Sequence, residues 1–136
     1  MPVQDNTSCW SDAGITCYSI YCFMKKYLGE EYAQKQYINV WQHDWNTYKN
    51  AFYIQHPEYL EKLSDRDVSN IMGSFQNIRL YSIMPLMILK GENALGGTTA
   101  FQKKLSELYL SHIRQPITYN DFLAATGLTK EAIELE

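Results

Sequence analysis

The hydrophobic pattern of this chain is strongest near its middle, where the seven residues Ile83–Leu89 form the longest apolar run without a charge. This run is too short to cross a membrane and too apolar to face water, so it predicts a buried helix. Proline has no N–H to donate and fits the first helical turn, so Pro85 places the helix start near residues 82–84 and the end falls near Asn93. Tyr81 is then expected just outside the start, with its phenol directed into a cleft. The commoner role of a buried core tyrosine is the favoured alternative.

A first helix is expected upstream of this run, with apolar residues on two faces. Ser11 or Asp12 can cap its N-terminus, and Gly29 ends it after about Leu28. The two faces are Ile15, Tyr18 and Cys22 on one side and Cys17, Ile20, Met24 and Tyr27 on the other. A helix that is apolar on both sides is usually buried on both sides. The pattern therefore predicts that this helix passes through the interior of a larger structure.

A second helix is expected from about Glu30 to Phe52, with an aromatic stripe along one face. The aromatic residues recur at spacings of four, four, three and four, at Tyr37, Trp41, Trp45, Tyr48 and Phe52. The favoured interpretation is core packing against the first helix. Two alternatives stay open, namely docking on a domain absent from this chain and a platform for a sugar or nucleobase. The platform would need convergent polar groups, and the sequence identifies none.

Proline, glycine and capping residues divide the rest of the chain. His56-Pro57 ends the second helix, residues 58–68 hold a short helix or turn, and Gly73 interrupts the pattern before the central helix. Gly96-Gly97 makes the next turn. A capping box of Thr99 and Gln102 then opens a helix to about His112, whose inward residues are Phe101, Leu105, Leu108 and Tyr109.

The C-terminal stretch predicts a short helix and one further turn. Thr118 caps the helix, Phe122 and Leu123 face the core, Gly127 ends it and Thr129 caps the last turn. No useful strand-like alternation and no internal repeat occurs. We therefore predict an all-α fold of about five to seven helices, as one domain over residues 10–136 after a flexible lead-in at residues 1–9.

Composition limits the function classes without selecting one. The chain has 46% hydrophobic and 20% charged residues and a net charge of −3, so it lacks the basic footprint of a nucleic-acid-binding protein. No signal peptide, transit peptide or transmembrane span is visible. Cys9, Cys17 and Cys22 show no Cys-x-x-Cys spacing and are interpreted as reduced core thiols, which is compatible with the cytoplasm.

The residues alone indicate no catalytic or metal site. His43, His56 and His112 stand far apart, no His-Glu-x-x-His segment occurs, and His43-Asp44 is interpreted as a solvated polar face. A Ser/His/Asp or Cys/His triad stays open, but no nucleophile elbow supports one. Gly96-Gly97 is interpreted as a turn and not as a phosphate-binding loop.

Two segments resemble the aminopeptidase N family of zinc metallopeptidases, the gluzincins. Residues 10–18, Trp-Ser-Asp-Ala-Gly-Ile-Thr-Cys-Tyr, are similar to the segment Trp-Leu-Asn-Glu-Gly-Phe-Ala-x-Tyr that follows the family's His-Glu-x-x-His helix. Residues 81–87, Tyr-Ser-Ile-Met-Pro-Leu-Met, are similar to the family's Tyr-x-Lys-Gly-(Ala/Pro)-Leu-Met. The colinear residues that follow are Leu95-Gly96, Phe101, Leu105, Tyr109, Thr118 and Asp121-Phe122. This resemblance implies the helical half of a thermolysin-like catalytic domain.

Carried over by position, the resemblance exposes a defect. The family's third zinc ligand, a glutamate, matches Ala13, whose methyl group cannot bind a metal, and Asp12 points about 100° away around the helix. The two histidine ligands and the base are expected upstream of residue 1. The family tyrosine that stabilises the oxyanion matches Tyr81, while the lysine and glycine after it are replaced by Ile83 and Met84.

The resemblance therefore implies part of a zinc aminopeptidase-like protein, or a pseudoenzyme relative of one. This chain alone is expected to bind no zinc and to cleave no peptide, and zinc and a peptide substrate belong to an intact parent. Its expected partners are the parent's upstream peptidase-like domain and, because the first helix has two apolar faces, a second copy of the chain. The alternative is a non-enzymatic helical protein-interaction module that uses the aromatic stripe.

Overall fold

The computed structural model describes residues 10–136, and all regular elements in that range are helical. The predicted all-α class is confirmed for these residues. The elements in chain order are η1 (Trp10–Ile15), α1 (Thr16–Leu28), α2 (Glu30–Ala33), η2 (Gln34–Ile38), α3 (Asn39–Lys49), α4 (Phe52–Gln55), η3 (Pro57–Lys62), α5 (Asp65–Ile78), η4 (Arg79–Ile83), α6 (Met84–Ala94), α7 (Thr98–Ser111), α8 (Tyr119–Thr126) and α9 (Lys130–Ile133). They are more numerous than expected because several are single turns. The predicted lead-in, residues 1–9, lies outside the described residues.

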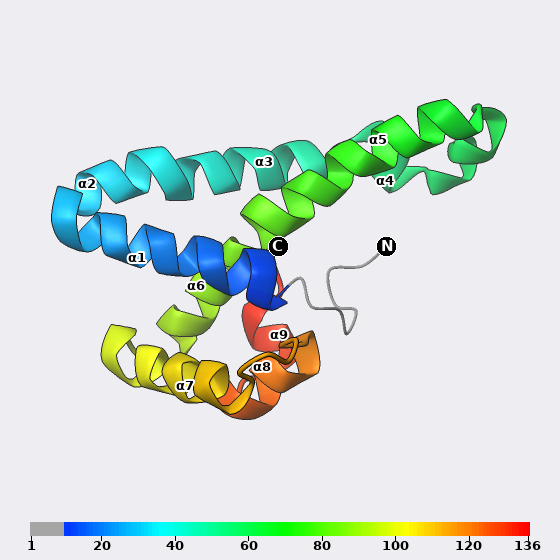
Figure 1. Cartoon of the computed structure of the whole chain (residues 1–136). Coiled ribbons are helices and arrows are strands. Elements are labelled where there is room, and N and C mark those ends of the chain that lie inside the picture. The colour runs from blue at the N-terminus through cyan, green and yellow to red at the C-terminus, as the bar shows by residue number, and fades with distance from the viewer. Residues whose placement is uncertain (1–9) are drawn as a thin grey trace.

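The first helical rod, η1 with α1, ends where the sequence predicts. Gly29 has a φ of +96°, and its N–H bonds back to the carbonyl of Lys25. The predicted start is wrong, because the backbone is already helical at Trp10, so Ser11 and Asp12 lie within the first turn. A second rod of α2, η2 and α3 then runs back beside α1 (Figure 1). It stops at Lys49 rather than Phe52, because Ala51 adopts an extended conformation before α4.

The central apolar run belongs to a longer helical path than predicted. α5, η4 and α6 follow one another without a break from Asp65 to Ala94, with the Ser64 hydroxyl capping the start. Gly73 lies inside α5, so the predicted interruption there is wrong. The predicted start near residues 82–84 agrees with the first residue of α6, Met84, and Pro85 lies in its first turn, but the helical path does not begin there. η4 is a wide π turn in which the N–H of Met84 bonds to the carbonyl of Arg79, so the chain reaches Pro85 without ending the helix.

The C-terminal helices follow the predicted caps with one exception. Thr118 and Asp121 form a capping box, Gly127 is left-handed at φ +72°, and the Thr129 hydroxyl caps α9. The predicted capping box of Thr99 and Gln102 is wrong, because α7 begins at Thr98 after Gly97 and carries no side-chain cap.

The core surrounds α6, which lies behind α1 and above α7 in Figure 1. Each residue from Ser82 to Ile88 is buried, and α6 contacts η1, α1, α3, α7 and α9. Phe101 of α7, Phe122 of α8 and Ile133 of α9 are completely buried around it. In contrast, α4, η3 and the first half of α5 project away from α7–α9 as an arm (Figure 1).

Among residues 10–136, no helix combines the length and the apolar character that a membrane crossing needs.

Candidate functional site

The two segments that carry the peptidase resemblance lie side by side. η1, which contains Ala13, contacts η4, which contains Tyr81. Ala13 is buried, whereas Tyr81 is 54% exposed and lies within a helix. Tyr81 precedes the first residue of α6, as expected, but it belongs to the helical turn η4, and its exposure shows that the favoured interpretation of a buried core tyrosine is wrong. Within residues 10–136, no three His, Cys, Asp or Glu side chains converge in a way that could hold a metal ion.

The residues beside Tyr81 are engaged in structural contacts. The buried Ser82 hydroxyl donates to Oδ2 of Asp44 at 2.6 Å and ties η4 to α3. Arg79 is buried and donates through Nη2 to the Gln76 side chain, while its Nη1 has no hydrogen-bond partner. These contacts position the turn that carries Tyr81.

One group of side chains resembles a serine triad in composition. The Ser111 hydroxyl and Nδ1 of His112 are 2.9 Å apart, and Nε2 of His112 lies 3.5 Å from Oδ2 of Asp121. The Ser111 hydroxyl donates to the Leu108 carbonyl at 2.9 Å, and Nδ1 of His112 lies 3.0 Å from the same oxygen. A hydroxyl that donates to a backbone carbonyl does not present its proton to the imidazole, and that transfer is the step that a triad requires. The group therefore ends α7 and joins it to α8.

Asp121 contributes to that junction through its negative charge. The backbone N–H of Thr118 donates to Oδ2 of Asp121 at 3.0 Å. This hydrogen bond holds the pKa of the Asp121 carboxyl below its usual value, and the nearby His112 acts in the same direction. The ionised carboxylate thus fixes the start of α8 beneath the end of α7. The other two histidines are on exposed positions, His43 on α3 and His56 beside Glu58.

Most of the aromatic stripe packs inside the chain. The Tyr21 ring of α1 contacts Tyr37 and Trp41, at ring-centre distances of 6.2 and 5.5 Å. Tyr48 packs edge to face on Phe75 of α5 at 5.8 Å. Core packing is therefore confirmed from Tyr37 to Tyr48, but the predicted packing against the first helix is confirmed only for Tyr37 and Trp41. It is wrong for Phe52, which is 53% exposed on the arm among other aromatic rings.

One of the two apolar faces of α1 is open to solvent. The face with Ile15 and Tyr18 is buried, as is Tyr21 beside it, while apolar side chains on the other side of α1 and on α7 are exposed. The exposed side chains that line one groove between the two helices, together with Tyr27, whose ring contacts Phe23, are called the α1–α7 face: Ile20, Phe23, Tyr27, Tyr109 and Leu110. Each of them is between 45% and 66% exposed. The predictions that α1 is buried on both sides and that Tyr109 points inward are therefore wrong within this chain.

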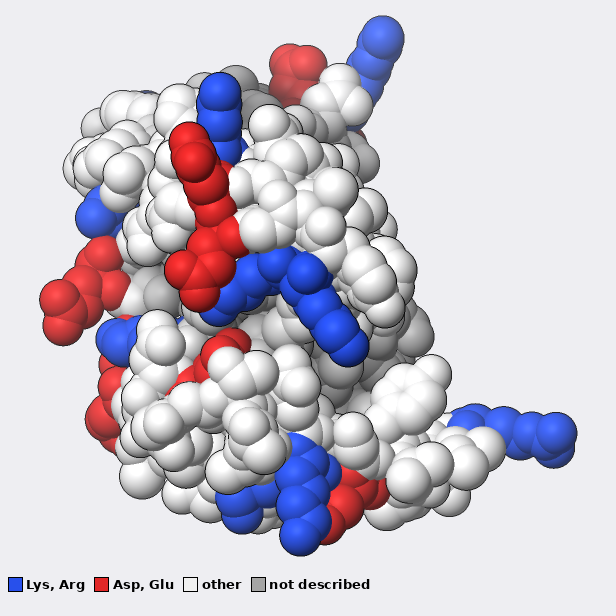
Figure 2. Space-filling view, turned by 90° about the vertical axis from the view of Figure 1, so that its left-hand side faces the viewer, with Lys and Arg blue, Asp and Glu red and all other residues white. Residues whose placement is uncertain are grey.

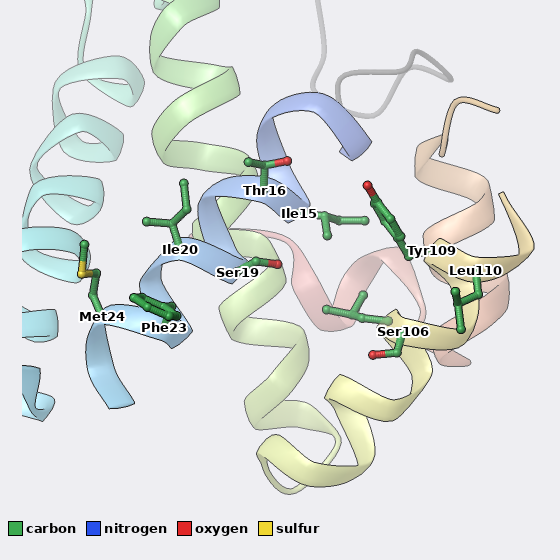
Figure 3. A pocket seen from close by; sticks show the side chains of 10 residues that line it. Ile15, Thr16, Ser19, Ile20, Phe23, Met24, Ser106, Tyr109 and Leu110 are labelled. Carbon is green, nitrogen blue, oxygen red and sulfur yellow. The ribbon is translucent and has the colours of Figure 1, made fainter. Parts of the chain in front are cut away.

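A groove of about 800 Å³ runs through this face between α1 and α7. Figure 3 shows Ile20, Phe23 and Met24 projecting from α1 on one side, and Tyr109 and Leu110 from α7 on the other. Ile15 and Leu105, both buried, lie at its base. The lining is almost entirely apolar, with only small hydroxyl groups such as Ser19 and Ser106 between the large side chains. Such a lining is suited to apolar side chains and offers no charge to a reaction.

The groove continues into smaller, polar cavities along the same two helices. A cavity of about 240 Å³ shares Ser19, Leu105 and Ser106 with the groove, and it shares Cys22 and Gln102 with the next one. That last cavity, of about 350 Å³, is lined by charged residues that include Lys25, Lys26, Glu30 and Glu92. On the molecular face where α1 turns into α2, charged side chains of both signs surround a largely uncharged surface (Figure 2). The polar end is therefore mixed in charge.

Glu92 is the central side chain of the polar end and is only 6% exposed. Its carboxylate accepts a hydrogen bond from the Tyr18 hydroxyl and another from the Thr98 hydroxyl at 2.6 Å. Burial, together with the hydrogen bond to Glu92, raises the pKa of Tyr18, so its hydroxyl keeps its proton. Glu92 thus joins α6 to both α1 and α7, which are the two walls of the groove.

Sequence reasoning did not identify the residues that make this site. Glu92 follows the apolar run as a single acidic residue, and nothing in its spacing indicates burial. The sequence indicated Phe23 and Leu110 only weakly. Each is an apolar residue that lies beside the inward-facing apolar positions of its helix. Burial also raises the pKa of the Cys22 thiol, which makes it a poor nucleophile beside the groove.

Comparisons of the chain with protein-family models, with curated proteins and with solved structures found no match. A function for this chain must therefore be inferred from the geometry of residues 10–136 alone. The aminopeptidase resemblance stays a hypothesis.

Proposed function

We propose that this chain is a non-catalytic helical protein-interaction domain that binds an amphipathic helix in the α1–α7 groove. The observation that carries the proposal is the exposure of five large apolar side chains in or directly beside one groove of about 800 Å³. Exposed contiguous apolar patches on a protein mark interaction sites and ligand-binding grooves. A helix laid in a groove presents side chains at i, i+3, i+4 and i+7, and two helical walls with an apolar base can receive that stripe.

The proposed site differs from the one in the alternative interpretation of the sequence. That alternative had the aromatic stripe bind a partner, but Tyr37 to Tyr48 are engaged with α1 and α5. In our proposal, the partner binds to the opposite face of α1 instead. The described residues that line the groove are apolar or carry only hydroxyl groups, which favours binding over catalysis.

The binding face can be tested with a hydrophobic dye and matched variants. Phe23 and Phe52 are the same residue type with similar exposure, 58% and 53%, but only Phe23 lines the groove. We expect anilinonaphthalene sulfonate to fluoresce with the dilute wild-type protein and with Phe52→Glu, and much less with the double variant Phe23→Glu/Leu110→Glu. Equal dye binding by all three proteins, with unchanged circular dichroism, would refute this location of the site.

A second candidate is the pseudo-peptidase relative, which the packing of η1 against η4 supports. The two segments of the resemblance, around Ala13 and Tyr81, are adjacent in space, as they would need to be in a shared catalytic half-domain. We expect the purified chain to contain no stoichiometric zinc by elemental analysis and to release no amino acid from an aminopeptidase substrate. Stoichiometric zinc together with release of an N-terminal amino acid would overturn the proposed lack of catalysis.

A further inference from the structure

We propose that the polar cavity of about 350 Å³ at the C-terminal end of α1 binds a small zwitterion of the free amino acid class. In this arrangement the ligand's ammonium group lies against the buried Glu92 carboxylate, and its own carboxylate lies at Lys25 and Lys26 on the rim. The site goes beyond the function proposed for the groove and stands independently of it.

Glu92 is a buried acid that the chain itself does not neutralise. It is 6% exposed, and its carboxylate accepts hydrogen bonds from two uncharged groups, the hydroxyls of Tyr18 and Thr98. No Lys, Arg or His among residues 10–136 forms an ion pair with it. Buried carboxylates are nearly always paired with a cation, because the protein interior solvates a charge poorly. A carboxylate has about four acceptor positions, so about two remain for a donor that enters the cavity.

Two lysines and a second acid line the same cavity. They are Lys25 and Lys26 of α1 and Glu30 of α2. Nζ of Lys25 lies 3.9 Å from Oε1 of Glu30, whose side chain is 86% exposed, so this ion pair is weak and leaves the lysine available. With Glu92 included, the lining carries two positive and two negative charges. A simple cation is repelled by the lysines and a simple anion by Glu92, whereas a ligand with separated charges of both signs complements both groups.

The size and the uncharged walls of the cavity fit a small ligand. Its volume of about 350 Å³ lies at the lower end of the range for small-molecule sites, about 300–1,000 Å³. The uncharged lining residues are Tyr21, Cys22, Thr98 and Gln102. The Tyr21 ring offers an apolar contact, and the Gln102 amide can both donate and accept hydrogen bonds. A few polar groups beside an apolar wall are the usual composition of a ligand site.

Titration of the intact chain with free amino acids tests the site. Each standard amino acid is added to isotope-labelled protein up to about 10 mM, and the shifts of the backbone amide signals give the Kd and the location. At least one amino acid should bind with a Kd below about 1 mM and shift the signals of α1 and of the residues around Glu92. Its decarboxylated amine and its deaminated acid should each bind at least about 10-fold more weakly, since each lacks one charged contact.

Variants at the two charged ends of the cavity assign the contacts. Glu92→Gln removes the negative charge but keeps an oxygen acceptor, and it should weaken binding at least about 10-fold. The double variant Lys25→Met/Lys26→Met leaves the buried hydrogen bonds of Glu92 in place and should remove the preference for the amino acid over its amine. The matched controls are Glu107→Gln, at an exposed position of α7, and Lys62→Met on the arm, and both should leave the Kd unchanged.

Three results would contradict the proposal. The absence of binding by every amino acid at about 10 mM overturns it outright. An amine that binds the wild type as tightly as its amino acid overturns the zwitterion and the role of the lysines. Binding that both Glu92→Gln and the lysine double variant leave unchanged, with folding verified by circular dichroism, overturns the assigned cavity, and the lysine variant decides alone where Glu92→Gln does not fold. None of these results bears on the groove, since Phe23-dependent dye binding is measured separately.

Discussion

Helices α6 and α1 have similar apolar patterns but different surroundings. Both carry apolar residues around most of their circumference, and both were expected to be buried on all sides. α6 is enclosed by η1, α1, α3, α7 and α9. α1 buries Tyr18 and Tyr21 but leaves Phe23 and Tyr27 in solvent. The difference teaches that a two-sided apolar helix predicts that both faces are covered, and does not say that the same chain covers them.

The largest expected effect is a difference in stability loss between a substitution in the enclosed helix α6 and one on the exposed face of α1. Ile88 of α6 is completely buried, so Ile88→Ala should lower the free energy of unfolding by about 2–5 kcal/mol. Ile20→Ala on the α1–α7 face should change it by less than about 0.5 kcal/mol in the monomer, because this side chain already contacts water. Urea unfolding of both variants at low protein concentration measures the contrast. Similar losses at the two positions would mean that the monomer covers Ile20.

The next effect concerns the side chain that joins the two helices. Glu92→Ala removes the acceptor of the buried Tyr18 hydroxyl and should cost about 1–3 kcal/mol of unfolding free energy. Glu92→Gln retains an oxygen that can accept a hydrogen bond, and it should cost less. Thermal or urea unfolding of the pair provides the measurement. If Glu92→Ala were as stable as the wild type, the link between α6 and α1 would contribute nothing.

The burial of Tyr18 on α1 should also make the free energy of unfolding depend on pH. The pKa of Tyr18 is raised in the folded state by burial and by its hydrogen bond to Glu92. The folded chain therefore holds a proton that the unfolded chain releases near pH 10. Stability is fully present below that pH and falls above it, by at most about 1.4 kcal/mol per pH unit for one group. Urea unfolding at pH 8 and above pH 10 should show a smaller loss for Tyr18→Phe than for the wild type.

The smallest effect compares two glycines on the same helical path. Gly73 in α5 has open space where a Cβ would lie, so Gly73→Ala should raise the free energy of unfolding by about 0.5–1 kcal/mol. At Gly91 in α6, a Cβ would lie 2.9 Å from Cδ1 of Leu128 and 3.3 Å from Cγ2 of Ile133. Gly91→Ala should therefore not raise the free energy of unfolding, because the added methyl group would crowd Leu128 and Ile133. Equal melting-temperature increases at both sites would contradict the close packing around α6.

The helix ends show how far local sequence signals reach. The ends at Gly29 and Gly127 were predictable because a glycine supplies the positive φ of a helix stop, and the Thr118 cap because its partners lie within three residues. The breaks expected at Gly73 and before Pro85 do not occur. Packing of α5, η4 and α6 against their neighbours overrides the weak preference of glycine, and the π turn of η4 adjusts the backbone before the proline.

The candidate site could be predicted only in part, because its residues come from distant segments. The two apolar faces of α1 were visible in the sequence, and so was the suggestion that a second copy covers one of them. The partnership of α1 with α7 was not, since Phe23 and Leu110 are 87 positions apart and neither belongs to a motif. Tyr81 was singled out by a motif, yet it lies exposed on η4, and residues 10–136 contain no group of His, Cys, Asp or Glu side chains that could hold a metal ion.

The sequence by itself determined the all-helical class, the buried character of Ile83–Ile88 and most of the caps and glycine stops, because these depend on side-chain periodicity and on contacts within a few residues. Only the tertiary structure decided which face of α1 is covered, where the aromatic stripe packs and that Glu92 is buried between α1 and α7. Those features depend on the distances between elements, and the periodicity of a single helix carries no record of its neighbours. The α1–α7 groove is therefore a property of how the helices are assembled.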